Sequence, residues 1–318
     1  MQNFLDFEKP LLEIQTKIEE LRHLKADSKN IANELTSLQE KYDEKLKEIY
    51  SNLTPWQKVK VCRHQDRPKI NDFIENIFED FINLSGDRSY SEDSALRGGI
   101  GEIDGHSVIV LGNDKGNNID SRVKNNFGMA KPEGYRKAIR LMSIANKFEF
   151  PIITFIDTPG AFPGVDAEDR GQSEAIASSI KACLKSSSPI FSFVVGEGGS
   201  GGAIALGVGN EVVMLENSIY SVISPEGCAS ILWRDSEMAN KAALSLKLTA
   251  QDLLELNVID DIIQEPIGGA HRNIFETCSS IKKRILIYLE KYKNLSDKEI
   301  LEHREKKFLE IGEKFIED

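Results

Sequence analysis

Two glycine-rich segments carry the residues of this 318-residue chain that are best suited to chemistry. The first is Asp157-Thr-Pro-Gly-Ala-Phe-Pro-Gly164, and the second is Gly196-Glu-Gly-Gly-Ser-Gly-Gly-Ala203. Each follows a predicted buried strand and precedes a predicted helix. Glycine lets a ligand touch the main chain, and a helix N-terminus adds unpaired N–H groups with partial positive charge. Such loops could stabilise an anion or an oxyanion.

The second segment fits a dinucleotide-binding fingerprint. Gly196, Gly198 and Gly201 form the pattern G-x-G-x-x-G after a strand. Glu216 follows about 20 residues later, where such sites place an acidic residue. The helix available to this loop is short and contains Gly207, so the fit to a dinucleotide site is weak.

The same glycines also fit the nucleophile elbow G-x-S-x-G of serine hydrolases. Ser200 would be the nucleophile, and Asp260 or Asp261 followed by His271 would complete the hydrolase order along the chain. Order alone does not establish contact in space, so this hypothesis requires that the side chains meet. Alternatively, Ser200 is simply a small residue that fits the loop and has no catalytic partners.

A third interpretation needs neither a nucleophile nor a redox cofactor. The main-chain N–H groups of Gly201 and Gly202, with Ala203 as a possible substitute, would form an oxyanion hole at the start of the helix. A close-packed turn without any function would favour the same residue type. On these residues alone, the three chemistries therefore stay open.

Composition narrows the classes of protein to be considered. Hydrophobic residues make up 40% of the chain and charged residues 29%, which is typical of a globular protein. The net charge of -11 argues against a nucleic-acid footprint. The four cysteines form no C-x-x-C pair, which argues against zinc or redox chemistry. Without a leader-like start or a membrane-length apolar run, we expect a cytoplasmic chain and no membrane partner.

Strand and helix signals alternate through the central part of the chain. Asp104-Gly105 predicts a β-hairpin, and apolar spacing predicts a helix from Pro132 to Phe148. Beyond them we expect strands over Pro151–Asp157, Pro189–Val195, Glu211–Glu216 and Val258–Gln264, with a helix over Ala167–Lys185. This alternation indicates a parallel sheet.

The regions at either end of the chain show helical periodicity. We expect a helical arm from Ile14 to Leu53 and long charged helices from Asn273 to Phe315. A further periodic run from Phe73 to Ile82 predicts a helix that Asn71 or Asp72 could cap. The arm must lean on its own domain or on another subunit, because a free helix pair buries too little apolar surface.

Several uncommon strings occur together and in order across most of the chain. They are Phe4-Leu-Asp-Phe-Glu8, Asn126-Phe-Gly-Met129, Pro132-Glu-Gly-Tyr-Arg-Lys137, Phe155-Ile-Asp-Thr-Pro-Gly160, Arg170-Gly-Gln-Ser-Glu-Ala175, the second glycine segment, Ser221-Val-Ile-Ser-Pro-Glu-Gly-Cys-Ala-Ser230 and Gly269-Ala-His-Arg-Asn273. Together they resemble the carboxyltransferase alpha-subunit family of multi-subunit acetyl-coenzyme A carboxylase.

The resemblance implies a fold and a set of partners. The expected fold is α/β and crotonase-like, built from repeated ββα units with helical extensions at both ends. Expected boundaries are an N-terminal helical arm over 1–68, a carboxyltransferase domain over 69–272 and C-terminal helices over 273–318. The implied partner is a beta subunit of similar fold that carries a zinc ribbon, in an alpha2beta2 heterotetramer. Biotin carboxylase and the biotin carboxyl carrier protein would complete the enzyme.

The resemblance also implies the reaction. Carboxybiotin, delivered on the carrier protein and not bound covalently to this chain, donates its carboxyl group to acetyl-coenzyme A, and malonyl-coenzyme A for fatty-acid biosynthesis is formed. No metal is expected in this chain. Gly201 and Gly202, with Ala203 as a possible substitute, would stabilise the biotin oxygen, while the beta subunit holds the thioester oxygen.

Further residues are candidates for substrate binding or proton transfer. Those expected to contact substrate are Gly160, Ala161, Phe162, Lys124, Lys131, Arg136 and His271. The cations among them could approach the coenzyme A phosphates. Asp157 and Glu168 could act as acid–base groups, although carboxylates at strand ends often cap the following helix.

Three alternatives from other classes stay open. A stand-alone crotonase-like hydratase or isomerase would place catalytic glutamates near the glycine loops. A serine hydrolase would use Ser200 as its nucleophile. A scaffold without catalytic activity would use the helical arm to bind a partner.

Overall fold

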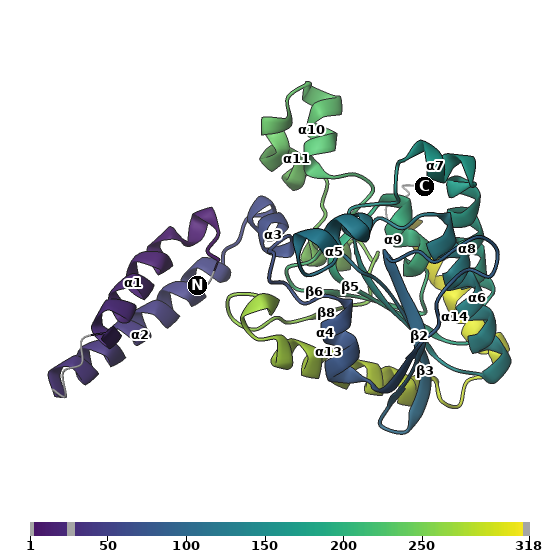
Figure 1. The fold of residues 1–318 in the computed structure, drawn as a ribbon, viewed down its shortest axis with the longest axis horizontal. Coiled ribbons are helices and arrows are strands. Elements are labelled where there is room, and N and C mark those ends of the chain that lie inside the picture. The colour runs from purple at the N-terminus through teal and green to yellow at the C-terminus, as the bar shows by residue number, and fades with distance from the viewer. Residues whose placement is uncertain (1–2, 24–28, 314–318) are drawn as a thin grey trace.

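A mixed sheet of eight strands forms the centre of the protein (Figure 1). The computed structural model describes residues 3–23 and 29–313. The strand order is β1-β2-β3-β4-β5-β6-β8, and β7 pairs with the end of β5; β1 to β3 are antiparallel, and the pairs from β3 onward are parallel. The strands are β1 (Glu79–Asn83), β2 (Leu96–Ile103), β3 (His106–Asn113), β4 (Ile152–Thr158), β5 (Ile190–Gly199), β6 (Glu211–Leu215), β7 (Ile219–Ser221) and β8 (Asp261–Ile263).

Helices cover both faces of this sheet, so its central strands are buried on both sides. On β4, Ile152 and Ile156 pack into one core, while Ile153 and Phe155 pack into the other. The first core is closed by α6 (Pro132–Phe148), α8 (Gln172–Lys185) and α9 (Ser200–Gly207), and the second by α4 (Ile70–Ile77) and α13 (Ile274–Tyr292). The continuous apolar run of β4 follows from this double burial.

The N-terminal arm is a pair of helices that extends away from the sheet (Figure 1). The helices α1 (Lys9–His23) and α2 (Lys29–Tyr50) lie along each other and share a small core made of Leu11, Ile18, Tyr42 and Leu46. The buried Glu8 fastens the base of the arm, because its carboxylate accepts hydrogen bonds from Tyr50 at 3.0 Å and from Arg272 at 2.6 Å. The two helices therefore pack mainly on each other, and Arg272 anchors the base of the arm by donating both to Glu8 and to the Tyr42 hydroxyl at 2.9 Å.

Shorter helices and the C-terminal helix complete the structure. They are α3 (Pro55–Cys62), α5 (Ile119–Lys124), α7 (Val165–Asp169), α10 (Pro225–Trp233), α11 (Ala239–Ser245), α12 (Ala250–Glu255) and α14 (Asp297–Glu310), with 3-10 turns at Asp6–Glu8, Asn126–Gly128, Ser236–Met238 and Ala270–Arg272. No helix within 3–23 and 29–313 is long and apolar enough to cross a bilayer.

Several predicted elements are confirmed. Asp104 and Gly105 turn the hairpin between β2 and β3 with φ angles of 46° and 79°. The helix from Pro132 to Phe148 has the predicted bounds. The predicted parallel strands are β4, β5, β6 and β8, although β8 is shorter than expected.

Other predictions are wrong in ways that backbone geometry explains. The run from Phe73 to Ile82 is not one helix: α4 ends at Ile77 because Phe78 is extended, and the remainder forms β1. Lys69 is the N-cap, and the Asp72 side chain accepts a hydrogen bond from its backbone nitrogen at 2.7 Å. The helix expected over 167–185 is two helices, α7 and α8, separated at Gly171 with φ of +81°. The predicted C-terminal helices are α13 and α14, and their expected end lies outside the described residues.

The C-terminal helix α14 is fixed to the body by one buried arginine. Arg304 is fully buried, and its guanidinium donates to the carbonyl oxygens of Cys183, Ser186 and Ser188 at 2.7–2.9 Å. It also donates to the side-chain oxygen of Asn210. Cys183 lies in the last turn of α8, whereas Ser186, Ser188 and Asn210 lie in the turns before β5 and β6, so Arg304 ties these segments together at the N-terminal ends of the strands.

Replacing Arg304 with methionine should lower the free energy of unfolding by about 3 kcal/mol, because several buried acceptors lose a charged donor. Urea denaturation measures this loss. The matched control is Lys306→Met on the same helix, whose exposed side chain should matter by less than about 0.5 kcal/mol. Equal stabilities for the two variants would contradict the assigned role.

Candidate active site

The two glycine segments meet at the carboxyl ends of β4 and β5. Thr158 pairs with Gly198, so both strands end at the same edge of the sheet. The first segment then passes over the start of α9. A Cβ atom on Gly202 would lie 2.6 Å from the carbonyl carbon of Gly160 and 2.7 Å from the nitrogen of Ala161. The contact between the two backbones therefore requires glycine at 202.

The second segment is less of a loop than its sequence suggests. Residues up to Gly199 continue β5 and pair with β7, so the chain passes from strand to helix within one residue. Ser200 makes this transition with φ of +52°, a left-handed conformation that is rare for a residue with a side chain. The first-turn N–H groups of α9 lack helical partners, and no side chain among the described residues caps them.

An apolar cleft of about 400 Å³ adjoins the start of α9. Ser200 and Gly201 line this cleft, whereas Gly202 and Ala203, the next residues of α9, are buried and do not line it. The other lining residues are Ile204, Tyr220, Ser221, Val222, Leu246, Leu253 and Val258. An apolar cavity that ends in peptide donors can hold a ring or chain whose polar oxygen reaches those donors.

Buried ion pairs lie beneath the same strand ends. Lys115 contacts Asp157 and Glu197 at 2.7 Å each, and Arg63 contacts Glu197 at 2.6 Å. Asp157 also accepts a hydrogen bond from the backbone nitrogen of Glu197 at 2.9 Å. Its carboxylate occupies the space that a Cβ atom on Gly196 would fill, since that atom would lie 2.1 Å from Oδ1. This cluster fastens β4 to β5 directly below the glycine segments.

The ion pairs keep the Glu197 carboxylate charged. Burial would raise the pKa of Glu197, but Lys115 and Arg63 outweigh burial and lower the pKa to about 2. Burial likewise opposes the charge of Lys115, yet the two carboxylates hold the pKa of that amine above its usual range. Glu197 is therefore ionised at neutral pH and is not available as a general acid.

The predicted hydrolase triad is not assembled. Ser200 lies at the start of α9, whereas His271 stacks on His64 with ring centroids 3.9 Å apart at the base of the arm. Asp260 is bonded to a backbone N–H of β6 and to a lysine of α14, and Asp261 pairs with an arginine of α13. Burial and the neighbouring His64 lower the pKa of His271 to about 3, so its ring is neutral. These residues serve packing and do not activate Ser200.

The predicted substrate-binding residues fall into separate groups. Gly160 to Phe162 lie against the start of α9, as described above. Lys131 pairs with Asp166 at 3.0 Å, and Arg136 donates to the carbonyl oxygen of Arg170. Lys124 is exposed at the end of α5, and Glu168, the acid–base candidate, is exposed on α7. The geometry thus places the first loop beside Gly201 and leaves the cations engaged or at the surface.

Asp157 was among the predicted candidates, but its neighbours in the charged cluster, Glu197 and Lys115, were not. Glu197 lies inside the second segment, and Lys115 follows the end of β3. Polar residues directly after buried strands converge at one edge of a parallel sheet, and this signal could have identified both.

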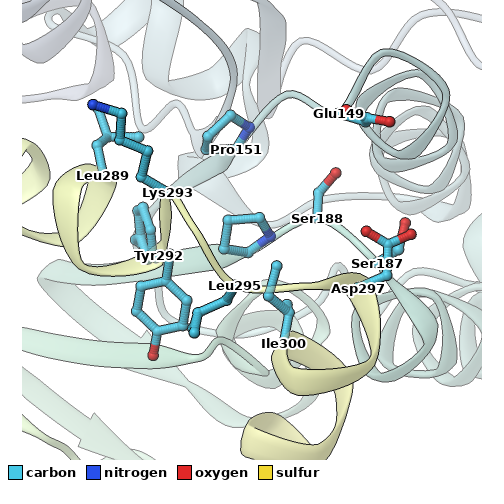
Figure 2. Close-up of a pocket in the computed structure, with 12 residues that line it drawn as sticks. Glu149, Pro151, Ser187, Ser188, Leu289, Tyr292, Lys293, Leu295, Asp297 and Ile300 are labelled. Carbon is cyan, nitrogen blue, oxygen red and sulfur yellow. The ribbon is translucent and has the colours of Figure 1, made fainter.

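A further hollow of about 180 Å³ lies at the N-terminal ends of β4 and β5 (Figure 2). Pro151 and Pro189, which precede β4 and β5, line it together with Tyr292 and Leu295 from the region of α13 and α14. Open α/β sheets bind ligands at the carboxyl ends of their strands, and this hollow lies at the other end. The cleft beside Gly201 is therefore the better candidate.

Comparison with solved structures supports the fold. The fold is similar to transcarboxylase 12S with methylmalonyl-coenzyme A and methylmalonic acid bound, with a TM-score of 0.58, 18% identity, and coverage of 71% of this chain and 41% of that chain. It is also similar to the beta subunit of P. aeruginosa geranyl-CoA carboxylase, with a TM-score of 0.55, 17% identity, and coverage of 80% and 45%. The chain spans less than half of either solved chain. These likenesses confirm the predicted crotonase-like α/β fold.

Sequence comparison defines the family. Residues 4–312 match the family described as "Acetyl co-enzyme A carboxylase carboxyltransferase-like". The chain is 53% identical over 319 residues to acetyl-coenzyme A carboxylase carboxyl transferase subunit alpha of Pelagibacter ubique (strain HTCC1062), covering 98% of this chain and 86% of that relative. The chain belongs to this family, and its function as the alpha subunit of a carboxyltransferase is confirmed. The hydratase, hydrolase and scaffold alternatives are not favoured.

Glu197 should make the stability of the fold depend on pH. Its folded pKa of about 2 lies below the ordinary value of 4.5, so its contribution is complete above pH 4.5 and is lost as pH falls toward 2. At neutral pH, Glu197→Gln should be less stable than the wild type by on the order of 3 kcal/mol, and this gap should narrow as acid is added.

Urea denaturation at a series of pH values between about 6 and 3 tests this dependence. Glu168→Gln, which removes an exposed carboxylate on α7, is the control, and its difference from the wild type should stay small throughout. A gap for Glu197→Gln that stays constant on acidification would show that its carboxylate is not held by the ion pairs.

Proposed function

We propose that this chain supplies the biotin-facing half of the carboxyltransferase site. Carboxyl transfer would run from carboxybiotin on the biotin carboxyl carrier protein to acetyl-coenzyme A, and malonyl-coenzyme A for fatty-acid biosynthesis would form. The observation that carries the proposal is that Gly201, in the uncapped first turn of α9, lines an apolar cleft. Membership of the family supports the reaction class.

The cleft suits a ring that carries a polar oxygen. Biotin supplies a ureido ring that carries the carboxyl group, and negative charge develops on its oxygen when that group leaves. Tyr220 and Val222 would contact the ring, and the N–H groups of Gly201 and Gly202 would donate to its oxygen, with Ala203 as a possible substitute. Peptide donors held by a helix need no rearrangement during the reaction, and losing one costs on the order of 3 kcal/mol of barrier.

The first glycine loop would set the position of these donors. Gly160 and Ala161 pack against Gly202. The peptide nitrogen of Phe162 donates to the Ala130 carbonyl at 3.0 Å, which ties the loop to the segment before α6. The loop would therefore hold the first turn of α9 in place, and we propose that Gly160 to Phe162, which lie outside the lining of the cleft, contact substrate through backbone atoms.

A second subunit would complete the site. The chain exposes the apolar side chains of Val222, which lines the cleft, and of Ile231 and Leu232, with 75%, 71% and 63% exposure. They lie on and before α10, which projects from the sheet with α11 (Figure 1). Apolar patches of this kind mark interaction surfaces. The proposed partner is a zinc-ribbon beta subunit in a cytoplasmic alpha2beta2 complex, which works with biotin carboxylase and the carrier protein.

Removing one peptide donor should slow the reaction without unfolding the chain. Gly201→Pro deletes the N–H group at a position in the first helical turn that tolerates proline. In the complex with the beta subunit, kcat should fall by roughly 100-fold or more. Gly201→Ala keeps the N–H group, and its Cβ atom would lie 3.5 Å from Ile176, so it should lose far less activity.

Thermal unfolding of both variants shows whether the fold is retained. If folded Gly201→Pro turned over like Gly201→Ala, the Gly201 amide would have no part in the reaction.

This chain alone should not carboxylate acetyl-coenzyme A, because one half-site stabilises only one of the two oxygens that become charged. Adding the beta subunit should restore formation of malonyl-coenzyme A from a free carboxybiotin derivative, which chromatography of the acyl-coenzyme A products measures. Full turnover by the purified chain would overturn the half-site proposal.

A further inference from the structure

Another hollow lies at the carboxyl ends of β4 and β5. It measures about 300 Å³ and is bounded by Pro159 of the first glycine loop and by Glu197. Phe127 forms another part of its wall and is 50% exposed, with φ of +55° between two other residues of positive φ. Strained backbone of this kind clusters at functional sites. The hollow therefore lies beside the proposed donors but is lined by different residues.

Four cationic side chains line this hollow, and only two of them have carboxylate partners. Lys115 is matched by Asp157 and Glu197, and Arg63 by Glu197 and Glu226. Within residues 3–23 and 29–313, no ion pair engages the other two cations, Lys69 and Arg122. In the described part of the chain, Arg122 donates to the carbonyl oxygens of Gly116 and Gln65. Positive charge is thus in local excess in a chain whose net charge is -11.

Lys69 is the most unusual of these cations. Its side chain is 7% exposed and lines the hollow, and among the described residues no hydrogen bond or ion pair reaches its amine. Burial lowers the pKa of Lys69, and the nearby Lys115 lowers it further, while Asp157 acts in the opposite direction. A buried amine without a partner costs stability, and a bound anion would remove that cost.

We propose that this hollow is an anion subsite, in which Lys69 and Arg122 bind a phosphate or carboxylate group beside Pro159 and Phe127. The two cations come from separate elements, the N-cap of α4 and the helix α5, so a ligand would bridge them. Naming its source rests on the proposed function, which offers two anionic groups: a phosphate of coenzyme A and the carboxylate carried by biotin.

Inorganic phosphate is the probe for the subsite itself. Titration of the full-length chain at constant ionic strength, followed by calorimetry and thermal unfolding, should show saturable binding and a raised unfolding temperature. Lys69→Met and Arg122→Gln should each weaken phosphate binding at least about tenfold, as expected when one charged donor is lost. Lys181→Met, which removes an exposed lysine of α8, should bind phosphate like the wild type.

Stability in phosphate-free buffer separates binding from a structural role. Lys69→Met removes a buried charge that has no partner, so its unfolding temperature should equal or exceed that of the wild type. Overturning results would be an unchanged phosphate affinity in folded Lys69→Met, no binding by the wild type, or a marked loss of stability in phosphate-free buffer. None of these measurements requires the transfer reaction, so they test the anion subsite independently of the proposed function.

Kinetics of the complex with the beta subunit then distinguish the two sources. If coenzyme A supplies the anion, Lys69→Met should raise KM for acetyl-coenzyme A and leave KM for the carboxybiotin donor unchanged. The reverse pattern would assign the subsite to the donor. If neither KM changed in a variant that had lost phosphate binding, the assignment to a substrate group would be wrong.

Discussion

The contact between the first glycine loop and the first turn of α9 constrains the whole site. Gly202 approaches Gly160 and Ala161 so closely that a side chain would collide with backbone atoms on both. Backbone cannot yield as a flexible side chain can, so the separation of the two segments is fixed. The direction of the uncapped N–H groups then follows from where β4 and β5 end. The sheet therefore determines where the peptide donors of α9 lie.

Buried charged residues beneath the two glycine segments also hold β4 and β5 together, through ion pairs. Asp157 and Glu197 are buried, but each contacts Lys115, so the cluster joins β4 to β5 with little net charge. Removing one member of such a cluster would leave an unmatched buried charge, which is the costly outcome. Lys69 differs because the described residues offer it no such partner. The same edge of the sheet thus holds a closed ionic cluster for structure and an open pair of cations for a ligand.

The sequence predicted what depends on local patterns and missed what depends on contacts between distant residues. The hairpin at Asp104-Gly105, α6 and the parallel strands follow from turn chemistry and periodicity. The break at Gly171 and the change from α4 to β1 at Phe78 could not be predicted in this way. Hydrophobic spacing does not reveal a single residue whose backbone conformation interrupts a helix. Lys69, Lys115 and Arg122 lie in separate segments, and only the fold brings them to one hollow. The sequence therefore predicted the glycine segments and Asp157, but not the cations and Glu197 that surround them.

The chemistry of the surrounding side chains limits what this chain can contribute. Glu197 is held ionised by Lys115 and Arg63, and His271 is neutral but stacked on His64 away from the cleft. Ser200 has no hydrogen-bonding partner among the described residues that could act as its base. No side chain described at the start of α9 is thus placed to take a proton, whereas its peptide donors are placed to stabilise negative charge. Under the proposed function, the group that removes a proton from the methyl group of acetyl-coenzyme A would arrive with the ligand, as the ureido oxygen of biotin that becomes negative when its carboxyl group leaves.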